Sequence, residues 1–146
     1  LPPGAQPERM RDVMRHRGPD DSGLWRSGDG SVVLVHRRLS IVDLSALGHN
    51  PMVWDGGRLS ITFNGEVYNF RELRSELEAE GCWFRSQTDS EVVLNALARW
   101  GTKAITRFNG MWALAIYDTE SGAMFLARDR FGIKPLLYAL LAPEKF

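Results

Sequence analysis

The chain has 146 residues, of which 44% are hydrophobic and 25% are charged, proportions typical of one globular domain with a single core. The formal net charge is +0, so we expect no nucleic acid and no membrane surface as partners. One cysteine and three histidines exclude an internal disulfide framework and a zinc-ligand cluster, and together with the absence of a signal peptide or a membrane-spanning run they favour a cytoplasmic location.

A short helix and two strands are predicted first. Apolar residues at helical spacing predict a helix over about 7–16, followed by a rigid charged loop at 17–21. Residues 24–25 and 32–35 are typical of strands, and the second strand continues through 36–38 into a loop. It carries two adjacent arginines, Arg37 and Arg38. Because neighbouring strand residues point to opposite faces, we expect only one of them to enter a pocket.

The segment 59–69 is predicted to join a strand to a helix. Leu59–Phe63 alternates apolar and polar residues, and Asn64-Gly65 is expected to end that strand. A hairpin turn is the alternative for Asn-Gly, but Asn69 and Glu72 form an N-cap signature that predicts a helix over about 70–80. At such a junction the Gly65 N–H and the Asn64 side-chain amide are two donors that can form an oxyanion hole for acyl transfer.

A third helix is predicted after a short strand at 82–84. Thr88 and Glu91 have the spacing of a capping box, and the apolar stripe that follows ends before Gly101. Asp89 falls in the first turn of this helix. There the helix dipole stabilises a carboxylate, so a purely structural role is the alternative to a functional one. Cys82, next to Trp83 and Phe84, is interpreted as a structural residue.

Strands are predicted again near the end of the chain. Residues 110–118 and 123–128 form a predicted hairpin, 129–135 a longer loop, and 136–140 a further strand. Strands thus gather at the two ends of the sequence, with two helices between them. This grouping favours an α+β fold with largely antiparallel sheets over alternating β-α-β units.

The chain carries five motifs in this order: His16–Asp21, His36–Asp43, Asn64–Asn69, Thr88–Glu91 and Arg128–Leu136. Together they resemble the glutaminase domain of glutamine-hydrolysing asparagine synthetases, a class II glutamine amidotransferase, over nearly the whole chain. Related amidotransferases would carry an Arg-Trp-Ala-Thr-like run at the second motif, which favours the asparagine synthetase branch.

The resemblance implies both a fold and a substrate. The fold would be of the N-terminal nucleophile hydrolase type, with two antiparallel β-sheets sandwiched between helices. The substrate would be free glutamine, with Arg38 on its α-carboxylate, for which a planar guanidinium is suited, and Asp89 on its α-ammonium. Glu66 and the backbone around Ile41 and Val42 would complete the pocket. Asn64 and Gly65 would hold the oxyanion.

The resemblance also implies a nucleophile, an N-terminal cysteine whose α-amine acts as the base. Position 1 is Leu, and Cys82 is no substitute because an internal cysteine has a peptide N–H in place of a free amine. We therefore expect residues 1–146 to be an amidotransferase domain cut at both ends and inactive alone. A covalently linked synthetase domain would use ATP and Mg²⁺ to activate aspartate, while these residues bind no cofactor or metal. A homodimer is left open.

Two alternatives stand beside this interpretation. The parent protein could lack the nucleophile, as lactam-forming relatives do, and keep the domain as a structural module of an ATP-dependent ligase. The joint presence of Arg38, Asn64-Gly65 and Asp89 favours the hydrolytic form. An α+β domain whose motifs are only turns and caps would not explain their order. Asn50, where the family more often has Gln, is a milder departure.

Overall fold

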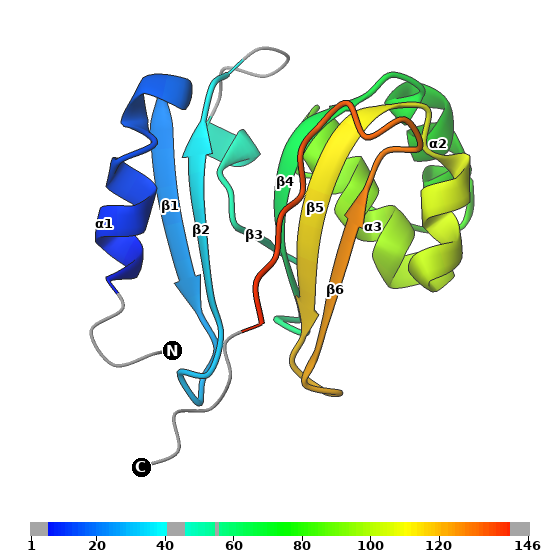
Figure 1. Cartoon of the computed structure of the whole chain (residues 1–146). Helices are drawn as coiled ribbons and strands as arrows, with labels where there is room; N and C mark the ends of the chain where they lie inside the picture. The colour runs from blue at the N-terminus through cyan, green and yellow to red at the C-terminus, as the bar shows by residue number, and fades with distance from the viewer. Residues whose placement is uncertain (1–5, 41–45, 55, 141–146) are drawn as a thin grey trace.

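The molecule is a stack of four layers in the order helix, sheet, sheet, helices (Figure 1). The computed structural model describes residues 6–40, 46–54 and 56–140. The first sheet pairs β1 with β2, and the second has the strand order β3-β4-β5-β6, with every pairing antiparallel. The elements are α1 (Pro7–Asp12), η1 (Arg15–Arg17), β1 (Asp21–Arg26), β2 (Val33–Arg38), η2 (Ala46–Gly48), β3 (Met52–Val53), β4 (Leu59–Val67), α2 (Phe70–Ala79), α3 (Asp89–Trp100), η3 (Gly101–Arg107), β5 (Gly110–Asp118) and β6 (Ala123–Arg128).

The main core lies between the second sheet and helices α2 and α3. Ile61, Phe63 and Val67 of β4 are buried there against residues such as Leu77 and Val92. Each side chain of this size contributes about 1.5–3 kcal/mol when fully buried. Because side chains alternate along a strand, the intervening residues of β4 face the first sheet. The second sheet therefore has an apolar face toward the helices and a more polar face toward β1 and β2.

Side-chain contacts between the two sheets include one polar pair and one aromatic pair. His36 Nδ1 of β2 lies 3.0 Å from Thr62 Oγ1 of β4. The rings of Trp25 in β1 and Tyr117 in β5 are 5.8 Å apart. The expected α+β fold, with two antiparallel sheets between helices, is confirmed. In the part of the chain that the structure describes, no helix is both long and apolar enough to cross a membrane.

Several predicted boundaries are wrong. Strand β4 does not end at Asn64-Gly65 but continues to Val67, because residues 64–67 pair with the first four residues of β5. The predicted strands at 82–84 and 136–140 are irregular, since neither segment has a ladder partner among the described residues. Helix α1 ends at Asp12 and gives way to the 3-10 turn η1, and the expected apolar face of this segment is exposed at Met10 and Val13.

The helix caps are only partly as predicted. Asn69 precedes α2 but makes no cap bond; its side chain donates to Arg107 O and accepts from Asn109 N–H. Thr88 Oγ1 does cap α3, accepting from Glu91 N–H at 3.2 Å. Glu91 does not return to the Thr88 N–H as a capping box would, because its carboxylate is already occupied by the preceding loop.

Candidate active site

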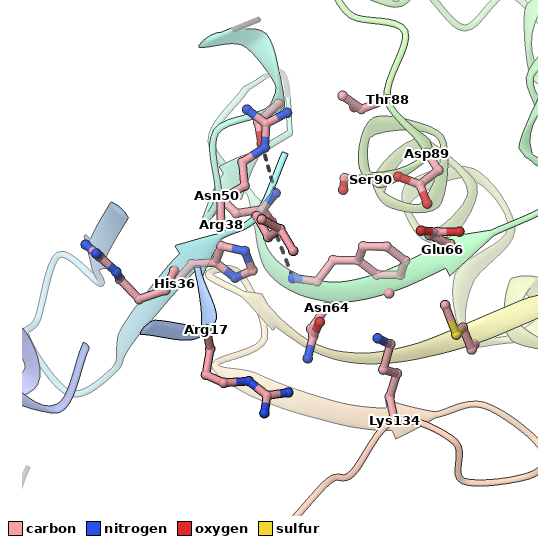
Figure 2. A pocket seen from close by; sticks show the side chains of 16 residues that line it. Arg17, His36, Arg38, Asn50, Asn64, Glu66, Thr88, Asp89, Ser90 and Lys134 are labelled. Carbon is pink, nitrogen blue, oxygen red and sulfur yellow. Dashed lines mark hydrogen bonds between the residues drawn. The ribbon is translucent and has the colours of Figure 1, made fainter. Parts of the chain in front are cut away.

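A cavity of about 240 Å³ opens between the two sheets, beside the start of α3. Its walls include Arg38, Asn64, Gly65, Glu66 and Asp89, which come from β2, β4 and α3 (Figure 2). These are all the predicted site residues that the structure describes. Ile41 and Val42 lie outside the described residues. One cavity therefore collects side chains from positions as far apart as 38 and 89.

Strand pairing directs the Gly65 N–H toward this cavity. The N–H and C=O groups of an antiparallel strand alternate between its two edges. The Tyr68 N–H donates to Asn109 O on the β5 side, so the odd-numbered N–H groups of β4 face the other edge. Two of them have side-chain acceptors: Phe63 N–H donates to Asn50 Oδ1 at 3.3 Å and Val67 N–H to Asp89 Oδ2 at 3.0 Å.

The Gly65 N–H lies between those two donors. Strand β3 covers this edge of β4 only at Ser60 and Ile61, which leaves the edge at Gly65 facing the cavity. The sequence prediction that Gly65 presents an accessible N–H is thus compatible with the geometry, although its reasoning from a strand-to-helix junction is wrong. The donor is accessible because the neighbouring strand is short.

Only glycine fits at position 65. Its φ of +155° lies in a region that other residues rarely adopt. A Cβ placed there would lie 2.5 Å from Trp112 Cα and would also overlap the Met111 carbonyl oxygen. The close approach of β4 and β5 at this point therefore depends on the missing side chain.

Arg38 ends β2 and lies against Gly48 of η2. A Cβ on Gly48 would lie 2.5 Å from the Arg38 guanidinium carbon, so this glycine makes room for the arginine. Both Arg37 and Arg38 line the cavity, and the expectation that only one of their side chains enters it stays a prediction. Alternation applies to side chains, whereas a cavity wall can also be formed by backbone atoms.

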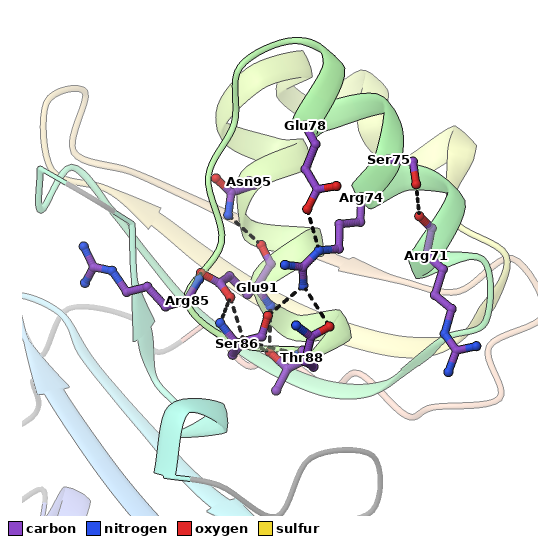
Figure 3. A network of polar contacts seen from close by, with 10 residues as sticks. Arg71, Arg74, Ser75, Glu78, Arg85, Ser86, Thr88, Glu91 and Asn95 are labelled. Atoms are coloured by element: carbon purple, nitrogen blue, oxygen red, sulfur yellow. Dashed lines mark hydrogen bonds and ion pairs between the residues drawn. The ribbon is translucent and has the colours of Figure 1, made fainter.

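A buried polar network fixes the loop that leads into α3 (Figure 3). The Glu91 carboxylate accepts from Arg85 N–H at 2.8 Å and from Ser86 N–H at 2.7 Å, and from Ser86 Oγ at 2.6 Å. The Arg74 guanidinium donates to Ser86 O at 2.7 Å from the side of α2. The first residue of α3, Asp89, is thereby held in place at the cavity.

Two carboxylates share one side of the cavity. Asp89 is only 7% exposed, and burial raises its pKa above the usual range. The nearby charge of Glu66 raises it further, whereas the hydrogen bond from Val67 N–H acts in the opposite direction. Within the described ranges, no cation forms an ion pair with either carboxylate. A pair of like charges of this kind is stabilised by a ligand that brings a positive charge.

Sequence reasoning missed several residues of the cavity wall. His36 is one; burial lowers its pKa to about 4, so its ring is neutral at neutral pH. Asn50, noted only as a departure from the family pattern, bridges η2 and β4 by donating to Gly48 O and accepting from Phe63 N–H. Arg17 and Lys134 also line the cavity. Their membership in the motifs at 16–21 and 128–136 was the only available signal.

Cys82 is not among the residues that line the cavity. It is partly buried and packs against the hydrophobic core, which agrees with the structural role expected for it. Among the described residues, no group of three or more His, Cys, Asp or Glu side chains could hold a metal ion.

Comparison with known proteins finds a matching family model and similar sequences. Residues 2–146 match the family model for a glutamine amidotransferase domain. A Mycobacterium tuberculosis protein named as a glutamine-hydrolyzing asparagine synthetase is 45% identical over 139 residues, covering 90% of this chain and 21% of that protein. The glutamine-hydrolyzing asparagine synthetase 3 of Bacillus subtilis is 40% identical over 133 residues, with the same coverage of 90% and 21%. The chain thus spans about a fifth of the length of these relatives.

Two solved structures share the fold. The glutamine phosphoribosylpyrophosphate amidotransferase of B. subtilis has a TM-score of 0.55 and 20% identity, covering 66% of this chain and 23% of its own. A structure described as the allosteric regulatory enzyme of purine biosynthesis has a TM-score of 0.58 and 21% identity, with coverage of 70% and 24%. At this identity the likeness concerns the fold alone, and it confirms the expected N-terminal nucleophile hydrolase type.

Proposed function

The chain belongs to the glutamine amidotransferase domains, and from this premise we propose that its cavity binds free L-glutamine for hydrolysis of the side-chain amide. Arg38 binds the α-carboxylate, and Asp89 with Glu66 binds the α-ammonium. Asn64 and Gly65 bind the oxygen of the side-chain amide. The backbone at Ile41 and Val42 completes the pocket as a prediction from the family resemblance.

One observation carries this proposal: the cavity has opposite charges on opposite sides. Arg38 lies on one side, and Asp89 and Glu66 lie together on the other (Figure 2). A free α-amino acid is a zwitterion and needs an anion and a cation at separate positions. A guanidinium suits a carboxylate because it can form two parallel hydrogen bonds. The two carboxylates, which repel one another, gain from an ammonium between them.

The amide end of the substrate would lie at β4. The Gly65 N–H faces the cavity from the strand edge, and Asn64 supplies a side-chain amide beside it. Two donors directed at the carbonyl oxygen stabilise the negative charge that develops on it during attack. The attacking thiolate would come from a cysteine outside residues 1–146, since Cys82 does not line the cavity.

For the whole protein we propose a glutamine-hydrolysing asparagine synthetase located in the cytoplasm. Residues 1–146 would form its amidotransferase domain, and a covalently linked synthetase domain would receive the ammonia. That domain would bind ATP and Mg²⁺ and activate the carboxylate of aspartate. The names of the relatives and their greater length support this assignment.

Titration calorimetry with L-glutamine tests the pocket directly. Arg38→Met and Asp89→Asn should each weaken binding at least about tenfold, because each removes a charged partner of the ligand. Matched controls are Arg58→Met and Asp118→Asn, which break an exposed ion pair elsewhere, with a distance of 2.8 Å between Arg58 Nη2 and Asp118 Oδ2. Unchanged affinity in both pocket variants would rule out the assignment. Ammonia release, measured on the protein with its N-terminal cysteine, tests the reaction.

A further inference from the structure

The proposed substrate contacts leave three cations of the cavity wall unused, namely Arg17, Arg37 and Lys134. Arg38, Asp89 and Glu66 are matched to the charges of the α-carbon groups. Lys134 lines the same cavity from the loop after β6, and its side chain extends toward β4 beside Asn64 (Figure 2). Within the described part of the chain, its ammonium forms no ion pair. It therefore lies at the end of the cavity assigned to the side-chain amide.

The position of Lys134 is fixed by a buried carboxylate. Asp129, 3% exposed, accepts from the N–H groups of Phe131, Ile133 and Lys134 at 3.0, 3.0 and 2.9 Å. The same side chain accepts from Trp112 N–H of β5 at 3.3 Å. These bonds, that of Lys134 N–H first, lower the pKa of Asp129. The backbone of 131–134 is thus connected to the strand that pairs with Gly65.

A cation at this position favours anionic states of the ligand over neutral ones. The amide of glutamine is neutral. Thiolate attack places a negative charge on its oxygen, and hydrolysis with water breaks the C–N bond, forms a C–O bond and releases ammonia. The product, L-glutamate, then carries a carboxylate where the amide was. A cation at this end therefore stabilises the negatively charged oxygen and the product carboxylate more than it stabilises the neutral amide of the substrate.

We propose that Lys134 is a specificity-determining residue whose ammonium contacts this new negative charge, so that the cavity binds L-glutamate as well as L-glutamine. This inference rests on the proposed function, since it takes the glutamine orientation from it. To the proposed function it adds a second ligand, the α-amino dicarboxylate L-glutamate. It also assigns to Lys134 the discrimination between L-glutamate and L-glutamine.

The test compares the affinities of L-glutamine and L-glutamate by titration calorimetry. Lys134→Met should weaken L-glutamate binding about tenfold, the effect of one charge-assisted contact, and change L-glutamine binding less than about twofold. Lys134→Arg should retain L-glutamate binding. Lys103→Met, which removes an exposed lysine outside the cavity, should change neither affinity. Lys134→Gln provides a second neutral variant should Lys134→Met fail to fold.

The outcomes separate this inference from the proposed function. Equal weakening of both ligands in the neutral variants would show a merely structural lysine and overturn the inference. Wild-type protein that binds L-glutamine but not L-glutamate would overturn it as well and leave the proposed function intact. Binding of neither ligand would overturn the proposed function and the inference together.

Discussion

Replacing Gly65 by alanine tests the strand geometry on which the candidate oxyanion site depends. The new Cβ would lie 2.5 Å from Trp112 Cα, against backbone that cannot rotate away, and alanine would have to adopt a φ of +155°. Overpacking of this kind costs roughly 1–3 kcal/mol. An unfavourable backbone conformation costs roughly 1–3 kcal/mol more. We expect Gly65→Ala to lower the free energy of unfolding by about 3 kcal/mol, or the melting temperature by roughly 6–12 °C.

Gly57→Ala is the matched control, because it separates the torsional cost from the steric one. Gly57 has a φ of +79°, but a Cβ there would meet no atom within 4 Å. We expect a loss of about 1 kcal/mol for this variant. Urea denaturation of both proteins measures the difference. If Gly65→Ala were no more destabilising than Gly57→Ala, the strands would not approach at Gly65 as described, and the argument for its exposed N–H would fail.

Four further predictions concern the network, two titrating groups and the cysteine. Glu91→Gln should destabilise the fold by about 2 kcal/mol, because a buried carboxylate that accepts three hydrogen bonds loses part of its acceptor capacity. The control Glu78→Gln, which alters an exposed ion pair, should cost under about 0.5 kcal/mol. Equal losses of unfolding free energy for the two variants in urea denaturation would contradict the network. His36 has a pKa of about 4 in the folded state and about 6.5 in the unfolded state, so the unfolded state binds more protons between these pH values. The free energy of unfolding should therefore fall by up to roughly 3 kcal/mol as the pH drops from 6.5 to 4. Denaturation at several pH values should show a shallower loss in His36→Asn, and an equally steep loss in that variant would contradict the reasoning. Because the pKa of Asp89 is raised, L-glutamine affinity should decrease on acidification as this carboxylate becomes protonated. An affinity that calorimetry finds unchanged down to pH 4 would contradict the role of Asp89. Cys82→Ala should leave L-glutamine affinity unchanged, and a tenfold loss would show that this thiol contributes to the site.

Local patterns predicted the central elements well. The hairpin at 110–118 and 123–128 was predicted with its observed bounds, because its alternating strands flank a clear turn. The helices α2 and α3 likewise follow from their apolar spacing. The strand predicted at 136–140 is absent because strand formation requires a partner, and apolar composition alone does not supply one.

The site was less accessible to sequence reasoning. Family resemblance singled out Arg38, Glu66 and Asp89, and the structure brings them to one cavity. The contributions of Gly48 and Glu91 depend on tertiary contacts: one makes room for the Arg38 side chain, and the other fixes the loop before Asp89. No local pattern indicates such contacts. The direction of the Gly65 N–H likewise follows from how far β3 extends along β4.

The charged sides of the cavity belong to different layers of the molecule. Arg38 comes from the two-stranded first sheet, and Asp89 comes from a helix beyond the second sheet. A two-stranded sheet is only marginally stable alone, so local opening of this layer would separate the two charges. Under the proposed function, glutamine at a hundred times its Kd would add about 2.7 kcal/mol to the free energy of that opening. The bound ligand would then hold the first sheet against the rest of the molecule, and amide hydrogen exchange in β1 and β2 would slow as the cavity becomes occupied.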